Sequence, residues 1–199
     1  MVQKRENTLV RQKEIIDAAG ELAVQYGSEH LTVRRIAQKV GFSEGAIYRH
    51  FKSKKDILSL LVEHIEDNLM GDIERARTAA RSPLEILNNV IRNHISSIQK
   101  RKGISFQVIA EVVSLGDKKL NRKVADVIDR YTTHIEDLLS QGIDSEEIRE
   151  DVDLDIAAKL LFGMIQGLVN IWVLSDYSFN LEEKCVPVWT VFYEGVVKH

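Results

Sequence analysis

The sequence has few cysteines, prolines and glycines. Its 199 residues include one cysteine, two prolines and eleven glycines. A single cysteine, Cys185, excludes an intramolecular disulfide and a zinc site built from cysteines, and it is typical of a reducing compartment. We therefore expect a cytoplasmic protein. The scarcity of proline and glycine excludes collagen-like and linker-like chains.

The chain also lacks the patterns that secretion or catalysis requires. Residues 1–7 are polar and charged, so we expect no signal peptide. The sequence contains no His-x-x-x-His pair, nucleophile elbow, phosphate-binding glycine loop or paired-carboxylate motif, and no base adjoins Cys185. It therefore predicts a protein that is not an enzyme and holds neither a metal ion nor a cofactor.

Charge is unevenly distributed along the chain. The sequence is 44% hydrophobic and 29% charged with a formal net charge of −3, which excludes a disordered chain. Residues 1–56 carry eleven lysines and arginines against seven acidic residues, a net charge of +4, and the remainder carries −7. A basic N-terminal segment followed by an acidic remainder indicates that residues 1–56 are the part that could approach nucleic acid. The alternative is that the asymmetry is an ordinary fluctuation in the distribution of charges over a soluble surface.

Apolar residues recur at helical spacing through almost the whole sequence, with no alternation typical of a strand. The spacing predicts an all-α fold of about nine helices. The predicted helices cover residues 11–26, 32–40, 43–50, 53–75, 83–98, 104–115, 124–142, 156–174 and 181–197.

The segment 156–174 approaches the length and apolar character of a membrane-spanning helix. Fourteen of its 19 residues are apolar, yet it contains Lys159, Gln166 and Asn170 and has no flanking cluster of basic residues. We therefore expect no membrane span. A helix that is apolar on most sides is instead covered by its own core on one face and by a partner subunit on the other.

Two short helices joined at Gly41 predict a helix-turn-helix, whose second helix enters the major groove of DNA. An αα-corner without DNA-binding function has the same outline. Phe42, Ile47 and Phe51 are spaced to pack the second helix against its neighbours. Gly45 inside this helix costs about 1 kcal/mol relative to alanine, which is reasonable where a backbone must approach another surface closely.

The residues of this segment favour one family. The sequence from Thr32 to Leu58 closely resembles the DNA-binding signature of the tetracycline-repressor (TetR) family. The positions in register are Ile36, Ala37, Gly41, Ser43, Gly45, Tyr48, His50, Phe51, Lys52, Ser53, Lys54 and Leu58. The resemblance covers about a quarter of the chain. Residues 148–153, leading into 163–168, look like the entry to the dimerisation helix of that family.

The resemblance implies roles for individual residues. Tyr48 and His50 match contacts to the DNA backbone, and Lys54 matches a phosphate contact at a helix N-terminus. Glu44 departs from the lysine frequent at its position; it either accepts from a cytosine amino group or simply faces solvent. The complete set of candidate DNA-binding residues is Thr32, Arg34, Ser43, Glu44, Gly45, Ala46, Tyr48, Arg49, His50 and Lys54.

The remaining helices are expected to bind an effector and to dimerise. We expect a helix-turn-helix domain at residues 1–52 and a helical effector-binding and dimerisation domain at residues 53–199. Candidate pocket residues are His94, Phe106, Glu111, Phe162, Gln166 and Asn170. Candidate interface residues are Gly163, Gly167, Trp172 and Trp189, on two helices that would form a four-helix bundle with those of a second copy. Each of these residues is otherwise ordinary core, and the two glycines could merely relieve crowding within the subunit.

Together these features predict a ligand-responsive transcriptional regulator. The resemblance implies a homodimeric repressor that binds double-stranded operator DNA and is released by a small apolar or amphipathic effector. The alternative is a dimeric helical ligand-binding or interaction protein in which DNA binding has been lost or altered.

Overall fold

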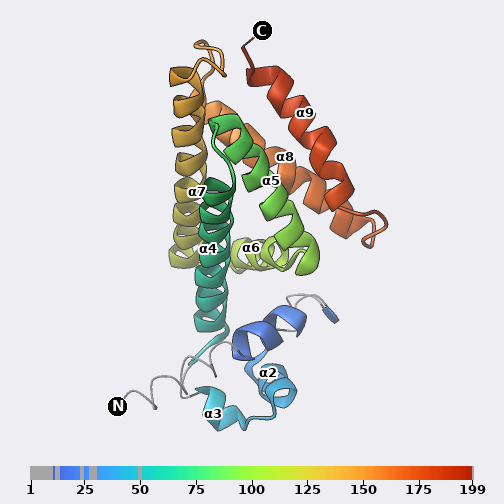
Figure 1. The fold of residues 1–199 in the computed structure, drawn as a ribbon. Coiled ribbons are helices and arrows are strands. Elements are labelled where there is room, and N and C mark those ends of the chain that lie inside the picture. The colour runs from blue at the N-terminus through green and yellow to red at the C-terminus, as the bar shows by residue number, and fades with distance from the viewer. Residues whose placement is uncertain (1–10, 12–13, 23–24, 27–30, 49–50, 199) are drawn as a thin grey trace. The chain divides into compact units, whose positions relative to one another are not determined.

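A computed structural model describes residues 11, 14–22, 25–26, 31–48 and 51–198 of the chain (Figure 1). Over these residues the fold is helical and contains no strand. A single isolated bridge joins Ile148 to Val197. The predicted all-α class is confirmed.

The helices follow the predicted order. Residues 14–22 and 25–26 are helical. They are followed by α2 (Val33–Val40), α3 (Glu44–Tyr48), α4 (Lys54–Ala79), α5 (Pro83–Lys100), α6 (Ile104–Leu115), α7 (Lys118–Asp144), α8 (Leu154–Leu174), the 3-10 turn η2 (Glu182–Lys184) and α9 (Cys185–Val196). Three predicted bounds differ by four residues or more: α4 continues past residue 75 to Ala79, α7 begins at Lys118 rather than near Val124, and α9 begins at Cys185 rather than at residue 181.

Several helices begin where the sequence places a capping side chain. Thr32 accepts from the N–H of Arg35 at 3.2 Å at the start of α2. At the start of α4, Ser53 accepts from the N–H of Asp56 at 3.4 Å, and Asp56 accepts from the N–H groups of Lys52 and Ser53 at 2.7 and 3.1 Å. This reciprocal arrangement is a capping box with aspartate in the third position. It fixes the residue at which α4 starts.

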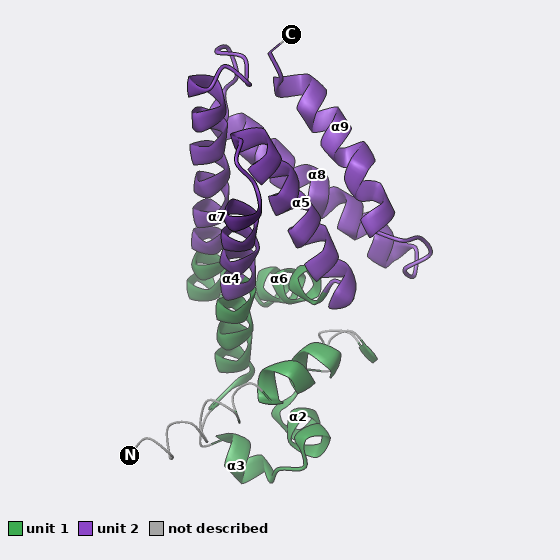
Figure 2. Ribbon diagram, viewed as in Figure 1, with its two compact units in different colours: residues 1–65, 104–124 green, residues 66–103, 125–199 purple. Residues whose placement is uncertain are grey.

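The chain divides into two compact units (Figure 2). The first unit comprises residues 1–65 and 104–124, and the second comprises residues 66–103 and 125–199. The first unit thus holds α2, α3, the start of α4, α6 and the start of α7. The predicted domain boundary between residues 52 and 53 lies inside this unit and stays a prediction.

Each unit buries its own apolar side chains. In the first unit, Ile36 of α2 and Ile47 of α3 have no exposed surface, because the two helices pack against each other. In the second unit, α9 packs on α5 and α8. The fully buried side chains of this unit include Leu87, Val90, Ile91, Ile95, Tyr131, Ile135, Leu138, Leu161 and Ile165. Burial of such side chains contributes about 1.5–3 kcal/mol each relative to exposure.

Within the described residues, α8 is the one helix long and apolar enough, by length and composition alone, to cross a membrane. One third of its most apolar stretch is buried inside the chain. The buried residues include Ala158, Leu161, Ile165 and Val169, which lie on one side of the helix. The opposite side exposes large apolar residues, together with Lys159 and Asn170.

Candidate DNA-binding, effector and dimer sites

The predicted helix-turn-helix is present in the first unit. Gly41 closes α2 in the left-handed conformation, with φ 71° and ψ 24°, which glycine adopts without a side-chain clash. The next residue donates its N–H to the carbonyl of Ala37 at 2.9 Å. Ser43 then caps α3 by accepting from the N–H of Ala46 at 3.2 Å. These local bonds reverse the chain within three residues and place α3 beside α2.

Most candidate DNA-binding residues lie on the solvent side of this motif. Ile47 is buried, whereas Tyr48 next to it is 49% exposed. Thr32, Arg34, Ser43, Glu44 and Gly45 are also exposed, and Ala46 is half-buried. Arg49 and His50 lie outside the described residues. In its described part, the motif therefore presents polar side chains and the aromatic ring of Tyr48 to solvent.

Gly45 and Glu44 show how this surface is built. A Cβ added to Gly45 would meet no described atom within 4 Å, so the fold of the chain does not require glycine there. Glu44 lies 3.8 Å from Arg34, with the two side chains 50% and 74% exposed. An ion pair this long and exposed contributes little. Base recognition by Glu44 stays a prediction.

Lys54, a candidate DNA-binding residue, pairs with a residue that the sequence assigned to a different site. Its ammonium lies 2.5 Å from the carboxylate of Glu111 on α6, a candidate effector residue. The adjacent Lys55 pairs with Asp117 at 2.6 Å, and the lysine hydrogen bond lowers the pKa of that carboxyl group. Both pairs lie inside the first unit. The start of α4 is therefore tied to the α6–α7 region.

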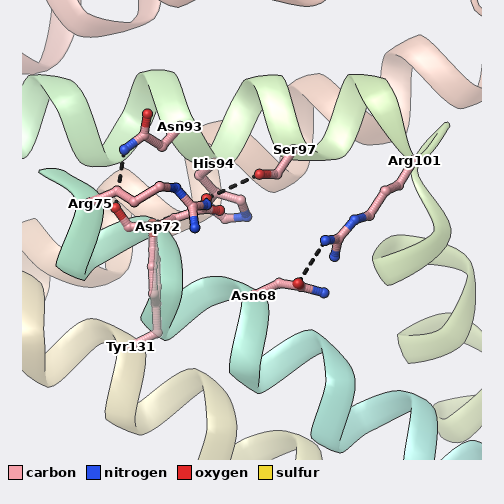
Figure 3. A network of polar contacts seen from close by, with 8 residues as sticks. All are labelled: Asn68, Asp72, Arg75, Asn93, His94, Ser97, Arg101 and Tyr131. Atoms are coloured by element: carbon pink, nitrogen blue, oxygen red, sulfur yellow. Dashed lines mark hydrogen bonds and ion pairs between the residues drawn. The ribbon is translucent and has the colours of Figure 1, made fainter. Parts of the chain in front are cut away.

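Two candidate effector residues, His94 and Phe162, contact Tyr131 in the second unit; Figure 3 shows His94 and Tyr131. His94 Nδ1 and the Tyr131 hydroxyl are hydrogen-bonded at 2.9 Å, and the rings of Tyr131 and Phe162 are 5.9 Å apart. Burial lowers the pKa of His94 to about 4, so the ring is neutral at ordinary pH. Of the other candidates, Gln166 is half-buried and Asn170 exposed on α8, and Phe106 and Glu111 belong to α6 of the first unit.

A polar network surrounds Asp72 of α4 beside this pair (Figure 3). Ser97 of α5 donates to Asp72 Oδ1 at 3.1 Å, Arg75 contacts the same oxygen, and Asn93 donates to the Asp72 carbonyl at 3.1 Å. The carboxylate is 1% exposed, and burial raises its pKa. Burial, together with the negative charge of Asp72, raises the pKa of Tyr131.

Neither Asp72 nor Tyr131 was among the sequence-based candidates. The spacing of Leu69, Asp72 and Ala76, which all lie on the inner face of α4, carried the signal for Asp72. Tyr131 falls in the apolar stripe of α7, where an aromatic residue is ordinarily core.

The exposed side of α8 is the main apolar surface of the second unit. Ile156, Leu160, Ile171 and Leu174 are 50–79% exposed there, and α9 adds Val186 and Val191 at 59% and 67%. An open groove of about 440 Å³ runs along Ile156, Lys159, Leu160, Gly163 and Met164. This apolar face is defined as the exposed residues of α8 and α9 just named.

The four candidate interface residues occupy different environments. A Cβ added to Gly163 or Gly167 would meet no described atom within 4 Å, so these glycines do not relieve crowding within the described part of the subunit. Trp172 is 4% exposed, and its indole N–H donates to the Phe179 carbonyl at 2.7 Å, inside the second unit. Trp189 is half-buried on α9.

Two family models match the chain. Residues 15–61 match "Bacterial regulatory proteins, tetR family", and residues 55–195 match "YsiA-like protein, C-terminal region". The first match spans the helix-turn-helix and the start of α4, and the second spans nearly everything after it. The two overlap over residues 55–61, in the first part of α4.

Similar proteins match over almost their entire length. The fatty acid metabolism regulator protein of Bacillus subtilis is 29% identical over 92% of this chain and 94% of its own. The nucleoid occlusion factor SlmA of Vibrio vulnificus is 28% identical over 91% and 93%. The crystal structure of the transcriptional regulator FadR from Bacillus subtilis in complex with stearoyl-CoA superposes with a TM-score of 0.80, at 28% identity, over 92% of this chain and 98% of that one.

Proposed function

Because this chain belongs to the tetR family of bacterial regulatory proteins, we propose that its helix-turn-helix binds an operator and that a long-chain acyl-CoA releases it. Members of the family are regulators and not enzymes; they bind operator DNA and small-molecule effectors and form dimers. The chain is a ligand-responsive DNA-binding transcriptional regulator. We place it in the cytoplasm, as a homodimeric repressor.

The exposed surface around α3 carries the DNA-binding part of the proposal. Tyr48 of α3 and Ser43 at its N-terminal cap are exposed, whereas Ile47 of the same helix is fully buried, so one side of α3 is packed and the other is open. Gly45 leaves room for a base or phosphate to approach the backbone. A phenol and a hydroxyl are suitable donors to phosphate oxygens.

Lys54→Ala is expected to weaken binding to duplex DNA of every sequence and to reduce the magnitude of the salt slope by about one, because one phosphate contact is lost. Lys39→Ala is the matched control. Lys39 has the same 30% side-chain exposure, pairs with Glu21 at 2.8 Å and is not a predicted contact. Fluorescence anisotropy over a salt series measures both slopes. An unchanged slope for Lys54→Ala would remove the phosphate contact from the proposal.

The effector class is inferred from the relatives and from the second unit. The B. subtilis regulator is solved with stearoyl-CoA. In this chain, His94, Tyr131 and Phe162 place two hydrogen-bonding groups beside an aromatic ring, next to the buried carboxylate of Asp72. Apolar side chains with a few polar groups among them are the surroundings that suit an amphipathic ligand. We assign the acyl end of the effector to the region around Phe162.

Stearoyl-CoA at saturation is expected to raise the dissociation constant for the duplex upstream of the coding sequence by about tenfold or more, as effector coupling usually does. Stearate and CoA, each added alone, are the controls, because each carries half of the proposed ligand. Gel-shift titration measures the change. If stearoyl-CoA binds the protein but leaves DNA affinity unaltered, the acyl-CoA response is wrong.

The apolar face supports dimerisation through α8 and α9. Large exposed aliphatic residues surround two glycines that leave the backbone of α8 open to a second helix. Small residues at a helix crossing permit close packing. A symmetric dimer supplies one recognition helix to each half-site of an operator.

A further inference from the structure

We propose that Glu111 of α6 is an internal competitor for the DNA phosphate that Lys54 would bind. The inference rests on the proposed DNA-binding function and concerns the charge of a single side chain. It assigns Glu111 to the control of DNA affinity, although the sequence placed it among the effector residues.

The contact is close and partly shielded from water. Lys54 Nζ and Glu111 Oε1 are 2.5 Å apart, and the two residues are separated by 57 positions in the sequence. The Glu111 side chain is 14% exposed, whereas Glu21 in the comparable pair with Lys39 is 66% exposed. A carboxylate that is less exposed is less screened by solvent and salt. Glu111 therefore neutralises Lys54 more effectively than a surface carboxylate would.

A second ion pair joins the start of α4 to the segment that follows α6. Asp117 accepts from Lys55 through Oδ2, and its Oδ1 caps α7 by accepting from the N–H groups of Lys119 and Leu120 at 3.1 and 3.0 Å. Both carboxylate oxygens of Asp117 thus accept hydrogen bonds. The Lys55–Asp117 pair therefore joins the start of α4 to the segment that directly follows α6, the helix that carries Glu111.

A phosphate approaching the first turn of α4 meets this ion pair. The helix N-terminus and Lys54 attract the phosphate, and the Glu111 carboxylate opposes binding by holding the Lys54 ammonium. Binding then requires Lys54 to exchange a carboxylate for a phosphate. The affinity of the chain for DNA is consequently lower than its lysines alone would provide, and it depends on where α6 holds Glu111.

Glu111→Gln tests this, because glutamine keeps the shape and a hydrogen-bond acceptor but removes the charge. The dissociation constant for mixed-sequence duplex DNA, which probes phosphate contacts alone, is expected to fall by about three- to tenfold. In a Lys54→Ala background the same substitution is expected to give no gain. Glu21→Gln, which removes an equal charge from the pair with Lys39, is expected to change the dissociation constant by less than about twofold.

The outcomes separate the inference from the function on which it rests. Tighter binding by Glu111→Gln that disappears with Lys54→Ala supports competition at this lysine. No gain, an equal gain without Lys54, or an equal gain from Glu21→Gln would overturn it. Failure of the unaltered chain to bind any duplex would contradict the proposed function instead. A loss of affinity with a lowered melting temperature would assign Glu111 a structural role and also overturn the inference.

Discussion

Arginine in place of Gly163 or Gly167 is expected to convert the dimer to monomers. Both glycines lie on the exposed apolar side of α8, where a Cβ would meet no described atom of its own chain within 4 Å. At the centre of the proposed interface, a long charged side chain would separate the helices and lose its hydration without a partner. Such a change raises a dimer dissociation constant by about a hundredfold or more. Sedimentation over a dilution series measures it.

The glycine substitutions are informative because they should not unfold the subunit. Arginine is a better helix former than glycine by about 1 kcal/mol, so folding of the isolated chain is expected to be preserved or improved. Thr133→Arg, at an exposed position of α7, is the matched control and should remain dimeric. A Gly163→Arg protein that sediments as a dimer at the same concentrations would place the interface elsewhere. Monomeric variants should also bind an operator weakly, since each would contact one half-site.

His94→Gln is expected to reduce by about 3 kcal/mol the amount by which the free energy of unfolding falls between pH 6.5 and pH 4. The pKa of His94 is lowered by burial from 6.5 to about 4, so between these pH values the unfolded chain binds a proton that the folded chain does not. The stability contributed by the neutral ring is therefore complete above about pH 6.5 and is lost as the pH falls towards 4. Urea unfolding at a fixed protein concentration measures this loss.

The comparison between the two proteins isolates His94 from its neighbours. Burial raises the pKa of Asp72, so that group gains a proton on acidification with the opposite effect on stability. Both proteins retain Asp72, and its contribution largely cancels in the difference. The difference in unfolding free energy between the two proteins should change by about 3 kcal/mol over this pH range. A constant difference would mean that His94 titrates normally, and that it is hydrated rather than enclosed with Tyr131.

The start of α4 illustrates what can be predicted from local sequence. The capping box of Ser53 and Asp56 joins residues only three positions apart, and the structure has both halves of it. Gly41 indicated the turn, and it adopts the left-handed conformation. Such features depend on residues within four positions of one another, so the sequence contains all the information needed. The η2 turn before α9 was not predicted, because helical periodicity does not distinguish a 3-10 turn from the first turn of an α-helix.

By itself, the sequence of this chain determined its helices, its helix-turn-helix and its resemblance to a family of regulators. Periodicity, caps and signature residues are local features of the sequence, so they can be recognised without knowing which residues are in contact in the folded protein. Tertiary structure decided which charges and polar groups meet. It brought Glu111 to Lys54, enclosed Asp72 beside Tyr131, and left the glycines of α8 facing outward. These contacts join residues that are distant in the sequence. The pKa values of the groups involved depend on burial and on the partner. Helical spacing predicts which face of a helix is buried, but not which residue it contacts.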